Sequence, residues 1–171
     1  MFSLFMPDWV YNDIYEITPE VLTSQGIRAL ILDIDNTLVT YDDPKPTERV
    51  ANWLEAMKNA GIAVAFVSNN HAPRVSVFCD GLGYYSHADA KKPSRRYLYE
   101  AMSHMNSDTT NTASIGDQVF TDIWAAKRCG MRAFLVSPIK DKKTPFFRFK
   151  RLLERPVLYE YRRRAAKMIN K

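Results

Sequence analysis

The chain has 171 residues, of which 46% are hydrophobic and 25% charged, and its net charge is +5. These values match one ordinary soluble globular domain that is large enough to bury a sizeable core. No apolar run approaches the ~20 residues needed to cross a bilayer, and the first residues lack the basic region and long apolar core of a signal peptide. Cys79 and Cys129 lie far apart without a C-x-x-C pair, which favours a reduced, cytoplasmic protein.

Residues 1–26 are expected to form an N-terminal arm and a short helix that pack on the body. The arm, residues 1–17, mixes aromatic, Met and acidic residues without clean periodicity. Thr18 followed by Pro19 is typical of a helix cap and a first helical position. Gly26 is a typical helix stop.

Residues 27–139 are expected to form the catalytic core, because short apolar runs alternate there with segments of helical periodicity. The predicted strands span 27–32, 62–67, 84–87, 111–115 and 132–136, and the predicted helices span 47–60, 73–80, 94–105 and 123–129. This alternation predicts an α/β fold, a doubly wound, Rossmann-like parallel sheet with helices on both faces.

Two aspartates end the first buried strand of this core. Successive residues of a strand point to opposite faces, so Asp33 and Asp35 can lean toward the same side of the strand tip. In open α/β sheets, ligands bind at this carboxyl edge. Two carboxylates can hold a divalent cation there, or one can attack phosphorus and form an aspartyl-phosphate. Taken alone, the pattern also fits a solvated turn.

Four further polar residues follow strand ends or begin helices. Ser68 can bind phosphate oxygens through its hydroxyl, or can cap a helix. Lys92 can neutralise phosphate, or can be half of a solvated pair with Lys91. Asp117 can complete an oxygen shell for Mg²⁺. Asp122 can hold Lys92 or a metal-bound water, or can cap a helix.

In this order the residues resemble the four motifs of the haloacid dehalogenase (HAD) superfamily phosphatases. The matching segments are Asp33-x-Asp35-x-Thr37, Ser68, Lys92 and Gly116-Asp117-x-x-x-x-Asp122. The resemblance covers residues 27–137, and it implies that Asp33 is the nucleophile and Asp35 the general acid/base. It also implies that Lys92 is catalytic and that the substrate is bound by Thr37, Ser68, Asn69 and Lys92. Mg²⁺ would be held by Asp33, the Asp35 backbone carbonyl and Asp117, with Asp122 in a supporting role.

The gaps between these motifs are short. Ser68 lies 33 positions after Asp35, and Lys92 lies 24 positions after Ser68, so the expected helices and strands leave no room for an inserted cap domain. An open site suits substrates with bulky or surface-held phosphate groups. The sequence therefore resembles the capless subfamily IIIA, which includes YqeG-type and phosphatidylglycerophosphate phosphatase-like proteins.

Residues 140–171 are expected to form a basic amphipathic C-terminal tail. They contain 12 Lys or Arg and 3 Asp or Glu and carry +9, whereas the remaining chain, with 12 basic and 16 acidic residues, carries −4. Such segregation points to an anionic partner surface. Pro156 is expected to end a first tail helix before a second basic one.

The first tail helix is expected to be two-sided. An apolar face would carry Phe149, Leu152 and Leu153, and a neighbouring basic face would carry Arg148, Arg151 and Arg155. This pattern fits peripheral contact with an anionic membrane through residues 144–171, and it equally fits a helix docked on the body with a solvated basic face. A basic patch also fits nucleic acid, but no base-reading module is visible, so nucleic acid is the least favoured partner.

The expected function is hydrolysis of a phosphorylated substrate with Mg²⁺, and a lipid phosphate such as phosphatidylglycerophosphate is the leading substrate. The expected location is the cytoplasm, with peripheral contact at the inner face of the membrane. The alternatives are a soluble sugar-phosphate or nucleotide phosphatase, and a non-catalytic binding or regulatory module that uses the basic tail. The sequence leaves the oligomeric state open.

Overall fold

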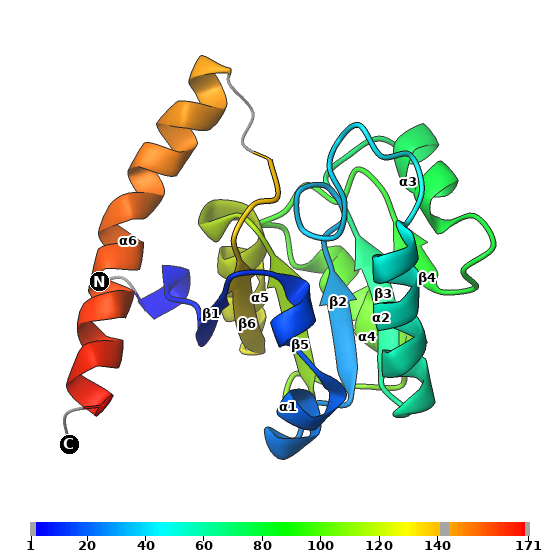
Figure 1. Ribbon diagram of the computed structural model, residues 1–171, viewed down its shortest axis with the longest axis horizontal. Coiled ribbons are helices and arrows are strands. Elements are labelled where there is room, and N and C mark those ends of the chain that lie inside the picture. Colours follow the sequence, from blue (N-terminus) through cyan, green and yellow to red (C-terminus); the bar gives the residue numbers. More distant parts are fainter. Residues whose placement is uncertain (1–2, 141–143, 170–171) are drawn as a thin grey trace.

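The computed structural model describes residues 3–140 and 144–169, which form one six-stranded sheet with helices on both faces (Figure 1). The strands are β1 (Trp9–Tyr11), β2 (Ala29–Leu32), β3 (Ala63–Val67), β4 (Tyr85–His87), β5 (Thr112–Gly116) and β6 (Arg132–Val136). The α-helices are α1 (Pro19–Ser24), α2 (Glu48–Asn59), α3 (Ala72–Cys79), α4 (Arg96–His104), α5 (Trp124–Cys129) and α6 (Pro145–Ile169). Short helical turns occur at Ser3–Phe5, Ile14–Glu16 and Val119–Ile123.

The strand order is β1-β6-β5-β2-β3-β4, and every neighbouring pair is parallel. The predicted α/β class and parallel sheet are confirmed, and no cap domain interrupts the described residues. From β2 the chain moves outward through β3 to β4, then returns to β5 on the other side of β2. The direction of winding therefore reverses between β2 and β5, and open α/β sheets bind ligands at such a point.

Two hydrophobic clusters lie on opposite faces of the sheet because side chains alternate along each strand. On β2, Leu30 and Leu32 belong to the cluster covered by α1, α2 and α3. Ile31 between them belongs to the cluster covered by α4 and α5. Burial on both faces explains why the strands are continuous apolar runs, a pattern typical of parallel sheets.

The N-terminal arm contributes the edge strand β1, which the sequence analysis did not predict. This strand pairs with β6 in register Trp9 to Phe134. It has only three residues, so periodicity gives it little signal. The backbone N–H of Val10 donates to the Tyr161 hydroxyl of α6 at 3.1 Å, so α6 covers part of the exposed sheet edge.

The C-terminal segment forms one continuous helix, α6, beside β1 and β6 (Figure 1). The expectation that Pro156 ends this helix was wrong. Pro156 is exposed, so its ring meets solvent, while buried Glu154 and Val157 hold the helix on the body from both sides of the proline. Tertiary contacts of this kind offset the hydrogen bond that proline removes. Among the described helices, none combines the length and the apolarity needed to cross a membrane.

Candidate active site

Asp33 lies just beyond β2, at the carboxyl edge of the sheet. Its backbone N–H donates to the Ile115 carbonyl at 3.0 Å, which continues the pairing of β2 with β5 past the strand end. Asn36 adopts a positive φ of 66°, and its N–H donates to the Val39 carbonyl at 2.7 Å. This tight turn brings the Thr37 hydroxyl back to donate to the Asp33 carboxylate at 3.4 Å.

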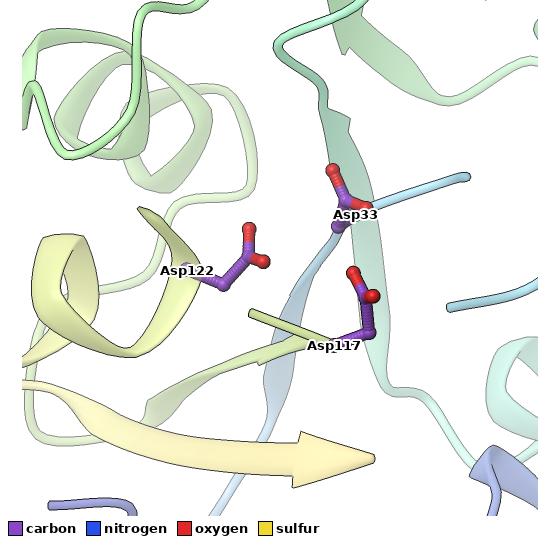
Figure 2. A group of neighbouring side chains, drawn as sticks. All are labelled: Asp33, Asp117 and Asp122. Carbon is purple, nitrogen blue, oxygen red and sulfur yellow. The ribbon is translucent and has the colours of Figure 1, made fainter. Parts of the chain in front are cut away.

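Three carboxylates gather at the point where the winding reverses. Asp33 follows β2, Asp117 follows β5 and Asp122 belongs to the Val119–Ile123 turn, and all three are buried. Each offers an oxygen within 4.8 Å of the other two. Figure 2 shows the three side chains projecting into the same space from their separate elements. Neighbours in the sheet that are distant in sequence thus build one acidic cluster.

Lys92 places its ammonium group inside this acidic cluster. The Nζ atom donates to Asp33 at 2.7 Å and to Asp122 at 2.6 Å. The Lys92 backbone is fixed by Asn69, whose side chain accepts from the Lys92 N–H at 2.6 Å and donates to its carbonyl at 3.1 Å. Asn69, which was expected to bind substrate together with Ser68, therefore also orients Lys92. Lys91, the neighbour of Lys92 in sequence, is exposed, so Lys91 and Lys92 do not form a solvated pair.

Gly116 is required by the position of Asp122. A Cβ atom at Gly116 would lie much closer to the carboxyl carbon (Cγ) of Asp122 than normal contact distance allows. The Asp122 carboxylate also accepts from the Gln118 N–H and the Thr121 hydroxyl, each at 3.2 Å. The glycine therefore makes room for the carboxylate that pairs with Lys92.

The Asp35 side chain is held by partners other than those of the acidic cluster, and it lines the same pocket as Asp33. Its carboxylate accepts from Nε and Nη2 of Arg74, at 3.0 and 2.9 Å, and from the Asn70 amide at 2.8 Å. Ser68, buried at the end of β3, accepts from the Asn70 N–H at 3.1 Å through its hydroxyl oxygen. Neither Arg74 nor Asn70 was singled out from the sequence, because a charged helix residue gives no indication of which loop it meets.

Helix α6 also reaches the site, which the sequence analysis missed. Arg151 was expected on a basic face with Arg148 and Arg155, but only those two are exposed. The Arg151 guanidinium instead binds the Asp117 side chain and donates to the Asp117 carbonyl at 2.6 Å. Glu154, one turn along, accepts from Arg151 at 2.9 Å and from the Val119 N–H at 2.9 Å. The three-residue spacing of Arg151 and Glu154 is visible in the sequence, but the sequence does not indicate that this face of the helix packs against the site.

An open pocket of about 220 Å³ lies beside Asp33 at the carboxyl edge of the sheet. It is lined by Asp33, Asp35, Tyr41, Ser68, Asn69, Asn70, Gln118, Thr121 and Lys150. Four of these, Asp33, Asp35, Ser68 and Asn69, were expected at the site from the sequence, whereas Lys150 comes from α6. Its ammonium lies 3.4 Å from the Gln118 amide oxygen.

The acidic cluster fits a divalent cation. Oδ1 of Asp117 is buried and, within the described part of the chain, has no hydrogen-bond partner. A buried carboxylate oxygen without a donor is costly unless something positive binds it. Asp33 and Asp122 bring further oxygen ligands of the kind that Mg²⁺ prefers.

Burial changes the titration of the cluster. Burial raises the pKa of Asp33 from 3.8 to about 7, against the opposing charge of Lys92. Burial and the charge of Asp122 raise the pKa of Asp117 to about 6, although Arg151 lowers it. Burial alone would lower the pKa of Lys92, but the charges and hydrogen bonds of Asp122 and Asp33 together raise it. The cluster thus favours a positive charge at its centre.

These shifts predict how the metal-free protein responds to pH. Between pH 3.8 and about 7 the folded state binds more protons at Asp33 than the unfolded chain does. The Asp33 contribution to the free energy of unfolding therefore falls as pH rises through that window. Asp33→Asn should flatten this dependence and stabilise the metal-free protein at pH 8 by about 1–3 kcal/mol. Urea unfolding in EDTA across pH 4–8 measures it, and parallel curves for both proteins would contradict the expectation.

A family model described as a haloacid dehalogenase-like hydrolase matches residues 8–130. Among curated proteins, the chain is 37% identical over 162 residues to the probable phosphatase YqeG of Bacillus subtilis, covering 95% of this chain and 94% of that one. It is 27% identical over 156 residues to the chloroplastic phosphatidylglycerophosphate phosphatase 1 of Chlamydomonas reinhardtii, covering 84% of this chain but only 57% of that protein.

Solved structures share the fold at lower identity. The cobalt-bound deoxy-D-mannose-octulosonate 8-phosphate phosphatase of Haemophilus influenzae superposes with a TM-score of 0.54 at 20% identity, covering 74% of this chain and 75% of that one. At such identity the likeness concerns the arrangement of strands and helices alone. It agrees with the α/β architecture built from the sequence.

Proposed function

Because the chain belongs to the haloacid dehalogenase-like hydrolases and is a phosphatase of that family, we propose that it removes phosphate from a lipid phosphomonoester with Mg²⁺ as cofactor. The observation that carries the catalytic half is the meeting of Asp33, Lys92 and Asp117 at the reversal point between β2 and β5. The location that follows from this proposal is the cytoplasmic side of a membrane, in peripheral contact with it.

In this proposal Asp33 attacks phosphorus and carries the phosphoryl group as an aspartyl-phosphate. Lys92, already 2.7 Å from the Asp33 carboxylate, offsets negative charge on the transferring oxygens. Ser68 and Asn69 line the pocket and bind the phosphoryl oxygens, and Thr37 shapes the turn that holds Asp33.

Asp35 would protonate the leaving oxygen and then take a proton from the attacking water. Arg74 and Asn70 hold its carboxylate beside the pocket that Asp33 also lines. Asp33, Asp117 and the Asp35 backbone carbonyl would hold Mg²⁺, with Asp122 in support through Lys92. When bound, Mg²⁺ would supply Lewis-acid neutralisation of phosphoryl charge.

The lipid half of the proposal is supported by the composition of α6 next to the pocket. Lys150 lines the pocket, while Phe149, Leu152 and Leu153 beside it are 57%, 54% and 47% exposed. The inward face of the helix is already occupied by Val157, which packs in the core. A second, exposed apolar surface flanked by arginines is typical of a helix lying on anionic lipid. The distant Chlamydomonas relative named as a phosphatidylglycerophosphate phosphatase suggests the substrate to test first.

Membrane contact is tested by flotation with vesicles of phosphatidylglycerol or phosphatidylcholine. We expect binding to phosphatidylglycerol vesicles that weakens in high salt, because the contact includes basic side chains. Leu152→Glu with Leu153→Glu should reduce this binding about tenfold or more. Val77→Glu is the matched control, since Val77 is an exposed aliphatic residue on α3. Absence of vesicle binding by the unaltered protein would contradict the lipid half.

The substrate is tested by phosphate release from phosphatidylglycerophosphate in mixed micelles against a panel of soluble sugar phosphates and nucleotides. The proposal expects the lipid to be turned over with the highest kcat/KM. A preference for a soluble ester would instead support the alternative substrate class and leave the catalytic residues in their proposed roles.

A further inference from the structure

The first turns of α6 join the acidic cluster through a buried Arg–Glu pair. Arg151 binds both the carboxylate and the carbonyl of Asp117, so it fixes the side chain and the backbone of one residue at once. Glu154 is 3% exposed and ties the same arginine to the Val119 N–H, at the start of the turn that carries Asp122. One helix residue pair thus contacts both ends of the loop that follows β5.

Arg151 gives the two oxygens of the Asp117 carboxylate different environments. Oδ2 accepts from the guanidinium, while Oδ1 is buried and finds no donor among the described residues. A carboxylate held through one oxygen cannot rotate freely about its terminal torsion. The ion pair therefore determines which oxygen faces the space shared with Asp33 and Asp122.

We propose that Arg151 is a positioning residue of the metal site and that Glu154 is its counterion. The proposal rests on the metal dependence of the proposed function. In it, α6 is a component of the active site rather than an appendage, and it presents Asp117 Oδ1 to the cation. Hydrogen bonds to a ligating carboxylate commonly set metal affinity in this way.

The charges at the site agree with positioning rather than competition. Four buried carboxylates, Asp33, Asp117, Asp122 and Glu154, face two cations, Lys92 and Arg151. With all six groups ionised the set carries −2, which one divalent cation neutralises. Because Glu154 offsets Arg151, the guanidinium leaves that charge in place for the metal. If Arg151 competed with the metal, its removal would strengthen Mg²⁺ binding. If Arg151 positions Asp117, its removal weakens Mg²⁺ binding, so the two ideas predict opposite changes in affinity.

The experiment measures Mg²⁺ binding directly by isothermal titration calorimetry, without substrate. We expect Arg151→Ala to weaken Mg²⁺ affinity by about 10- to 100-fold. Arg151→Lys should recover only part of it, because an ammonium cannot bind the carboxylate and the carbonyl in the same fork geometry. Arg155→Ala, which removes an exposed arginine one turn along the same helix, should change the affinity less than twofold.

Circular dichroism of each metal-free variant shows whether α6 and the sheet remain folded. If Arg151→Ala does not fold, Arg151→Gln serves instead, since it also removes the guanidinium charge but keeps a longer polar side chain; it should also weaken Mg²⁺ binding. Unchanged or tighter Mg²⁺ binding by a folded Arg151→Ala or Arg151→Gln variant would overturn the proposal, as would an unaltered protein that binds no Mg²⁺. Normal Mg²⁺ binding without turnover of any phosphate ester would refute the proposed function alone and leave this inference standing.

Discussion

Asp33→Asn should lower kcat for phosphate release by roughly 10⁴-fold or more while the protein stays folded. The amide is nearly the same size as the carboxylate but cannot attack phosphorus, so the loss follows from chemistry rather than from packing. Asp33 pairs with the buried ammonium of Lys92, and the raised pKa of Asp33 shows that its environment tolerates a neutral group there. Steady-state assays of both proteins with Mg²⁺ measure the effect.

Asp80→Asn is the matched control for this result. Asp80 is an exposed aspartate at the end of α3, where it lies 3.6 Å from Lys45. The same isosteric change there should leave kcat within about twofold, since exposed ion pairs contribute little. Activity of Asp33→Asn within tenfold of the unaltered protein would remove Asp33 from the nucleophile role.

Lys92→Met should both abolish turnover and destabilise the fold. Lys92 bonds to Asp33 at 2.7 Å and to Asp122 at 2.6 Å, and all three side chains are almost fully buried. Removing one partner of a buried ion pair leaves an uncompensated charge, which costs about 3–5 kcal/mol. Urea unfolding of both proteins at pH 8, above the raised pKa of Asp33 in the unaltered protein, measures the loss.

A double-mutant cycle separates this cost from lost packing. Adding Asp122→Asn to Lys92→Met removes one of the two stranded carboxylates and should recover part of the stability, about 1–2 kcal/mol. Additive losses of stability would show that Lys92 and Asp122 act independently, and would contradict the coupling expected from their ion pair. Turnover should remain absent in the double variant, because the cation that faces the phosphoryl oxygens is still missing.

Local sequence signals predicted the central elements of the fold because those elements are determined locally. β2 is a four-residue buried run flanked by Gly26 and Asp33, and Thr18 caps α1 by accepting from the Val21 N–H as its position predicted. The predicted strands and helices of residues 27–139 all occur, with ends that differ by one or two residues, apart from the helix predicted at 123–129, which begins with a π-helical turn at Val119.

The elements that the sequence did not predict depend on distant contacts. Strand β1 forms because Trp9–Tyr11 pair with β6, which lies more than a hundred residues later in the sequence. α6 passes through Pro156 because Glu154 and Val157 are buried against the body. No window of neighbouring residues contains either partner, so propensity favoured an irregular arm and a broken helix.

The candidate site divides in the same way. Asp33, Lys92, Asp117 and Asp122 could be named from motif order and from their places at strand ends, and the structure brings all four together. The residues that hold them could not be named. Arg74 and Arg151 are ordinary helix arginines in the sequence, and only the packing of α3 and α6 turns them toward Asp35 and Asp117.

The most direct test of the proposed mechanism is a burst experiment with ³²P-labelled p-nitrophenyl phosphate and the Asp35→Asn variant. The p-nitrophenolate leaving group of this substrate needs no proton, so attack by Asp33 can proceed in the variant. Hydrolysis of the aspartyl-phosphate is slowed, because the variant lacks the general base Asp35. The mechanism predicts rapid release of about one p-nitrophenol per protein, followed by slow turnover, with the label on Asp33 after acid quenching and peptide mapping. Phosphate released as fast as p-nitrophenol, or label on a different residue, would contradict an aspartyl-phosphate at Asp33.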